Sequence, residues 1–138
     1  YGFSTLGLNT TGAANTAIGV SALGNNIDGN SNTAIGASAL NNNTSGWQNV
    51  AIGVGSQSFN KTGGNNVSIG VEALGRNTAG TQNVAIGNKA GTYINLSAAP
   101  LTSSYWSVFI GHNTSALVDG SLNEIVIGYN ANKINKKI

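Results

Sequence analysis

Residues 15–46 read NTAIGVSALGNNIDGNSNTAIGASALNNNTSG, so the phrase Asn-Thr-Ala-Ile-Gly returns after 17 residues. Related phrases end at Gly53, Gly70 and Gly87, and degenerate copies end at Gly111 and Gly128. The interval between these glycines is 17 residues, except for the 24 residues that separate Gly87 from Gly111. The chain is therefore an array of repeats, and one copy contains an insertion of seven residues.

The repeat unit predicts short strands rather than helices. Two glycines in each copy, with Asn and Thr between them, remove helix propensity. The residues of Asn-Val-Ala-Ile-Gly alternate between β-branched side chains and very small ones, which is typical of a strand with two different faces. A single copy cannot bury a core, but stacked copies place equivalent residues about 4.8 Å apart. Asn and Leu recur at fixed positions, so we expect amide ladders and an apolar ladder. Gln57 interrupts the Leu ladder, and we expect Phe59 to fill that gap.

These patterns predict an all-β fold, a parallel β-solenoid with 17-residue coils. Regular coils occupy residues 1–93, an inserted loop occupies 94–106, and two degenerate coils with the C-terminal end occupy 107–138. The absence of Met predicts that the sequence is a segment of a longer protein.

The strand phrase is apolar on both faces, and a strand of this kind is usually covered on both sides. The Val and Ile side chains are expected to line the interior of the coil. The small side chains on the opposite face would then contact another copy of the chain around an axis. The predicted homotrimer interface therefore consists of Ala17, Ala34, Ala51, Ser68 and Ala85.

Composition excludes several classes of function. Charged residues make up 7% of the chain, against about 25% in average proteins. The few Lys and Arg residues do not form the basic cluster that nucleic-acid binding requires, so a nucleic-acid partner is not expected. No apolar run approaches the length of a membrane-spanning helix, so membrane insertion is not expected. Cys is absent, which excludes disulfides and cysteine ligands. We expect no cofactor and no metal site, although three copies of His112 could meet on a symmetry axis.

We also expect no enzymatic activity and no catalytic residues. Glycoside hydrolysis requires two positioned carboxylates, and the only pair in one coil is Asp119 with Glu124. No Ser lies in the sequence of a nucleophile elbow.

Receptor contact is predicted at three aromatic residues. Tyr105 and Trp106 end the insertion, and insertions in solenoids form loops that often bind partners. Trp47 stands in a turn position that small or polar residues occupy in the neighbouring copies. The alternative at each position is packing, either within the coil or across a subunit seam.

The phrase Asn-Val-Ala-Ile-Gly, followed by Ala and Leu, resembles the head repeats of YadA-like trimeric autotransporter adhesins. Residues 15–46 are more similar to the variant of this repeat in phage tail-fibre proteins, and the resemblance covers about residues 1–93 and 107–132. It implies a left-handed parallel β-roll in which three chains form a rod that attaches to a host or substrate. Phe109 and Val126 depart from the small-residue position.

The expected function is therefore that of a structural and adhesive fibre segment in a virion tail fibre, which binds a glycan or protein receptor on a host cell. The alternative is the head of a bacterial adhesin at the cell surface. An ice-binding solenoid is disfavoured because Thr is irregularly placed, and a hexapeptide-repeat acyltransferase because a six-residue period does not divide 17. A glycan-degrading tailspike would depend on Asp119 and Glu124.

Overall fold

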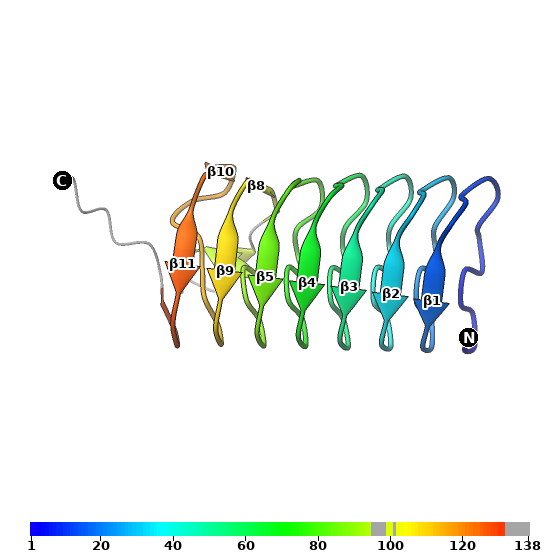
Figure 1. The fold of residues 1–138 in the computed structure, drawn as a ribbon, viewed down its shortest axis with the longest axis horizontal. Helices are drawn as coiled ribbons and strands as arrows, with labels where there is room; N and C mark the ends of the chain where they lie inside the picture. The colour runs from blue at the N-terminus through cyan, green and yellow to red at the C-terminus, as the bar shows by residue number, and fades with distance from the viewer. Residues whose placement is uncertain (95–98, 101, 132–138) are drawn as a thin grey trace.

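The computed structural model describes residues 1–94, 99–100 and 102–131, which form a parallel β-solenoid of about six turns. One sheet of seven strands runs along the whole solenoid (Figure 1). Its strands, in spatial order, are β1 (Thr16–Ile18), β2 (Thr33–Ile35), β3 (Val50–Ile52), β4 (Val67–Ile69), β5 (Val84–Ile86), β9 (Val108–Ile110) and β11 (Ile125–Ile127). The described part of the chain contains no helix with the length and apolarity that crossing a membrane requires.

Strand pairing follows the sequence repeat. Ala17 pairs with Ala34 and Ala34 with Ala51, so each residue lies beside its equivalent in the next turn. The 24-residue interval between Gly87 and Gly111 keeps this register, because Ala85 of β5 pairs directly with Phe109 of β9. The extra residues therefore leave the sheet undisturbed, and the all-β parallel solenoid predicted from the repeat is confirmed.

The insertion is shorter than the sequence predicted. β6 (Tyr93–Ile94) and β7 (Ala99–Pro100) pair antiparallel beside the solenoid, whereas β8 (Ser104–Tyr105) pairs parallel with β10 (Ser121–Leu122). Backbone N–H groups of Thr78 and Thr81 donate to Thr102 and Ser104, so residues from Thr102 onward already belong to the next turn. Within the predicted loop 94–106, residues 95–98 and 101 lie outside the described residues, as do 132–138 at the C-terminal end.

The sheet faces are the reverse of those predicted. Ala17, Ala34, Ala51, Ser68 and Ala85 are buried inside their own chain, together with Phe109 and Val126. Val and Ile of the same strands are half-buried or exposed on the outer face. The small side chains lie inside because the opposite wall of a narrow coil, formed by residues such as Ala22 and Leu23, approaches them closely. Assignment of the Ala column to a subunit interface was therefore wrong.

The Leu column contains a polar residue in the core. Gln57 is fully buried in the place of Leu23, Leu40 and Leu74, and its Nε2 donates to the Ser68 hydroxyl at 2.8 Å. The predicted substitute, Phe59, lies outside with 51% of its surface exposed. Gln57, Ser56 and Ser68 form a small polar cluster in which the two Ser hydroxyls are 2.5 Å apart. This cluster lies between two separate apolar clusters of the core.

Two Asn ladders stabilise the turns, as predicted. In the first, Nδ2 of Asn43 donates to Oδ1 of Asn26 at 2.7 Å and to the carbonyl of Gly46 at 3.0 Å. In the second, Oδ1 of Asn32 accepts from both the backbone N–H and the Nδ2 of Asn49, at 3.0 and 3.1 Å. Most of these amides are fully buried, so the ladders satisfy polar groups that would otherwise be costly to bury.

Candidate functional site

The outer face of the sheet is apolar along the solenoid. The outward side chains of the strands are Thr, Val or Ile at the first position and Ile at the third. The residue after each Gly forms a separate column, in which Val20, Val54 and Val71 are exposed beside the polar residues Asn88 and His112. We call the Thr/Val and Ile positions of these strands the outer face. Monomeric proteins rarely expose apolar patches larger than a few hundred Å², so the outer face has the character of an interaction surface.

Trp47 lies on a turn and packs over the next coil. A Cβ added to Gly64 would lie 2.8 Å from Cε2 of this indole, so only Gly leaves room for the ring. The Trp side chain remains 46% exposed, and the Trp47 carbonyl accepts a hydrogen bond from the N–H of Asn65. The indole is thus fixed by its neighbour while it presents much of its surface to solvent.

Tyr105 and Trp106 lie further along the same edge of the solenoid. Tyr105 forms a parallel bridge with Thr81, and the N–H of Gln82 donates to the carbonyl of Gly64. Trp47, Gly64, Thr81 and Tyr105 therefore occupy one column of successive turns, with about 14 Å of axis between the two aromatic residues. Trp106 is 52% exposed, and its Nε1 donates to Oε1 of Gln82. The structure thus places the three predicted receptor-contact residues along one edge, here called the aromatic edge.

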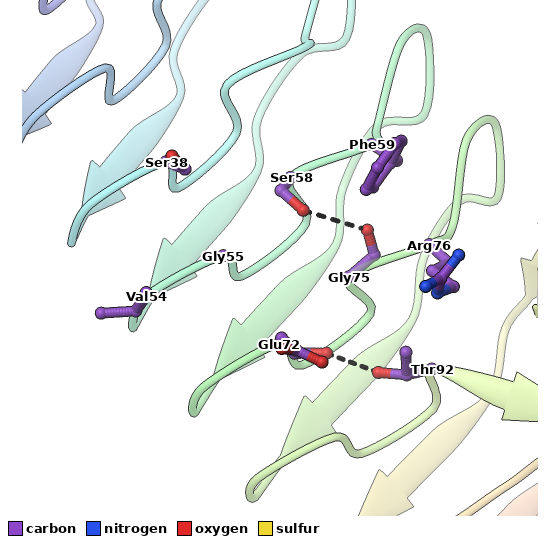
Figure 2. Close-up of a pocket in the computed structure, with 9 residues that line it drawn as sticks. All are labelled: Ser38, Val54, Gly55, Ser58, Phe59, Glu72, Gly75, Arg76 and Thr92. Atoms are coloured by element: carbon purple, nitrogen blue, oxygen red, sulfur yellow. Dashed lines mark hydrogen bonds between the residues drawn. The ribbon is translucent and has the colours of Figure 1, made fainter.

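A groove of about 230 Å³ lies elsewhere on the solenoid, beside the turns that follow β3 and β4 (Figure 2). Phe59 and Arg76 lie on successive turns at one side of it, and Glu72 and Val54 lie at the other. The Arg76 guanidinium is 6.0 Å from the centroid of the Phe59 ring and 5.8 Å from that of Tyr93. Glu72 forms an ion pair with Lys89 at 3.9 Å, and both side chains are partly exposed.

Sequence reasoning missed this groove, because Phe59 was assigned to the core. The sequence does contain a signal for the groove, in the residues that recur at 17-residue spacing from Phe59. In its first turns the column holds Leu8, Asn25 and Asn42, and it then changes to an aromatic–cation–aromatic series: Phe59, Arg76 and Tyr93.

The two carboxylates of the C-terminal coils have structural partners. Glu124 is almost fully buried, and its two oxygens accept from the N–H of Leu117 at 3.4 and 3.3 Å. Asp119 accepts from the N–H groups of Thr102, Ser103 and Gly120 and from the Thr102 hydroxyl. Burial raises the pKa of Asp119, but these hydrogen bonds together lower it below the ordinary value of 3.8. Both groups thus hold the backbone of the turns around them.

His112, which was considered as a residue that three copies could bring together on an axis, lies on the exposed surface of the chain. It stacks on Tyr129 with ring centroids 5.2 Å apart and an interplanar angle of 17°. Within the described residues, no group of three or more His, Cys, Asp or Glu side chains could hold a metal ion.

Comparison with known protein families, with curated proteins and with solved structures gives no match, so the functional argument depends on the outer face, the aromatic edge and the groove.

Proposed function

We propose that this chain is a structural and adhesive segment of a homotrimeric fibre of the phage tail-fibre type, which attaches to a glycan or protein on a host cell surface. In this proposal each chain is a left-handed β-roll with 17-residue coils. The observation that carries the proposal is the outer face, an apolar surface that extends over all seven strands of a chain poor in charge.

A second copy of the chain is the partner that fits this surface best. The outer face repeats at the spacing of the turns, and an identical chain carries the same repeat with the same spacing. The described strands of the outer face contain no charged residue, so like charges would not oppose each other across an axis. Burial of the Ile and Val columns would contribute about 25 cal/mol for each Å² of apolar surface removed from water.

The aromatic edge supplies the attachment surface in this proposal. Trp47 and Trp106 are large side chains that are held by neighbours yet exposed, which is typical of residues that contact a partner. The same arrangement would serve the head of a bacterial trimeric autotransporter adhesin, which is the alternative setting.

Light scattering after size exclusion provides the first test. We expect a solution mass about three times the 13.9 kDa of one chain. A stable monomer would contradict the fibre.

A glycan array then tests attachment. We expect the wild type to bind a subset of glycans, and Trp47→Ala or Trp106→Ala to lose that binding at unchanged mass. Leu8→Ala, which removes an exposed apolar side chain in the column of Phe59, outside the aromatic edge, is the control. Equal binding by both Trp variants and the wild type would exclude the aromatic edge as the attachment surface.

A further inference from the structure

Phe59 is exposed, although a position in the nearby core is occupied by a polar residue. Two residues earlier, Gln57 is fully buried, and its Oε1 accepts no hydrogen bond from any described residue. A sequence selected for stability alone would place the apolar side chain inside and the polar one outside. Departures of this kind from the local pattern concentrate at functional sites. The exposed position of the Phe59 ring therefore indicates that the ring contacts a ligand or partner rather than stabilising the core.

Arg76 is oriented beside that ring. Its guanidinium lies between Phe59 and Tyr93, at distances suited to cation–π attraction to both rings. Within the described residues, it forms no ion pair with a carboxylate. Two aromatic neighbours restrict a side chain that is otherwise flexible, and its N–H groups remain available for an anion. The guanidinium is thus pre-organised and lacks a charged partner of its own.

The groove beside these two residues offers polar groups of defined orientation. The Thr92 hydroxyl donates to the carbonyl of Glu72 at 2.5 Å, and the Ser58 hydroxyl donates to the carbonyl of Gly75 at 3.3 Å (Figure 2). Both hydroxyl oxygens can therefore still accept a hydrogen bond from a ligand. The carboxylate of Glu72 is a further acceptor, and its charge is balanced by Lys89.

We propose that this groove binds a sugar that carries a carboxylate, such as a uronic acid residue of a surface polysaccharide. The Arg76 guanidinium would form two parallel hydrogen bonds with the sugar carboxylate. The Phe59 ring would stack on the apolar face of the pyranose, and Glu72 and Ser58 would accept hydrogen bonds from the sugar hydroxyls. A groove of about 230 Å³ is below the range of drug-sized pockets, which suits a single sugar ring. This inference rests on the proposed function, because it names the ligand class of an attachment protein.

The test is an NMR titration of the intact chain, in its native oligomeric state, with methyl β-D-glucuronide. Methyl β-D-glucoside, which lacks the carboxylate, and acetate, which lacks the ring, are the matched probes. We expect the glucuronide to bind at least about tenfold more tightly than either probe, because a charge-assisted pair and a stacking surface act together. The largest shifts should occur at the Arg76 side chain and the Gly75 amide.

Variants assign the contacts. Arg76→Ala should abolish glucuronide binding, and Arg76→Lys should weaken it because an ammonium cannot form the paired hydrogen bonds. Phe59→Leu keeps an apolar side chain but removes the stacking face, so binding should also fall. Lys61→Ala, a cation that does not line the groove, should bind the glucuronide as the wild type does.

Two outcomes would overturn the inference: equal affinity for glucuronide and glucoside, or unchanged glucuronide binding by Arg76→Ala. If the shifts instead centre on Trp47 and Trp106, the inference fails while the proposed attachment function stands. If the protein is a monomer but Arg76-dependent binding is present, the fibre proposal fails and the acidic-sugar site stands.

Discussion

Each coil holds several residues in the left-handed region of backbone conformation, at positions where Gly is not used. Ser31, Gln48 and Asn65 occupy one such column, with φ values of 58°, 53° and 57°. Residues other than Gly cost about 1–2 kcal/mol in this conformation, and Asn tolerates it best. The cost recurs along the solenoid, because a turn of this shape requires the conformation in every coil.

Replacement of Ser31 by Gly should therefore stabilise the protein. The φ of 58° at Ser31 suits Gly, and the side chain is exposed. We expect Ser31→Gly to raise the free energy of unfolding by about 0.5–1 kcal/mol in urea melts. Ser45→Gly is the matched control, since Ser45 is also exposed but does not have a positive φ. That substitution should lower stability by a similar amount, and effects of the same sign in both variants would contradict the explanation.

Asp119 should make the turn at Thr102 and Ser103 sensitive to acid. Its pKa in the folded protein lies below the ordinary value of 3.8, so the hydrogen bonds are fully present above that pH. They are lost as the pH falls through the lower folded pKa, when the carboxylate is protonated. NMR titration should show the amide protons of Thr102 and Ser103 shifting together below pH 3.8, and not in Asp119→Asn. A transition of these amides above pH 3.8 would contradict the assignment.

At the level of the element, the ladder through Asn49 joins successive turns. Nδ2 of Asn49 donates to the carbonyl of Gly63 at 2.8 Å, and its Oδ1 accepts from the backbone N–H of Asn66 at 3.1 Å. Substitution by Ala would leave these buried partners without hydrogen bonds. Because one unsatisfied buried group costs about 1–3 kcal/mol, we expect Asn49→Ala to destabilise the fold by about 3 kcal/mol.

Asn49→Ser should fall between Ala and the wild type in the same unfolding measurements. Ser107 occupies this column near the C-terminal end, where its hydroxyl accepts from the N–H of Glu124 at 3.1 Å. A Ser can thus replace the acceptor but not the donor of the Asn. Equal stability of the Ser and Ala variants would show that the acceptor contributes little.

The repeat was sufficient to predict the parallel solenoid, the strand register and the two Asn ladders, because each depends only on which residues recur at which spacing. The repeat could not show which of the two strand faces lies inside the coil. Ala51 and Ile52 alternate whichever face is inside, and only the distance to the opposite wall makes Ala the inner residue. The burial of Gln57 depends on the Ser68 hydroxyl on the opposite wall of the coil, which the Leu pattern does not reveal. The groove was missed for the same reason, since it exists only because Phe59 lies outside.

For the whole molecule, the reversed faces change which substitutions should affect assembly. Ala51 is fully buried within its own chain, so Ala51→Leu would overfill the coil. Overpacking of this kind costs about 1–3 kcal/mol, so this variant should lower the unfolding midpoint. The outer neighbour Ile52 is only half-buried in the single chain, and its side chain would reach a partner across the axis.

In the proposed trimer, Ile52→Lys should therefore separate the chains without unfolding a coil. Three Lys side chains would meet around the axis in an apolar interface, where unpaired charges are strongly disfavoured. Light scattering should report the mass of one chain, and circular dichroism should retain the β signal. Thr44→Lys is the control, because the next turn already carries Lys61 at the equivalent position. That variant should keep the wild-type mass. If Thr44→Lys separates the chains and Ile52→Lys does not, the subunits associate through another surface, and the outer face must contact a different partner.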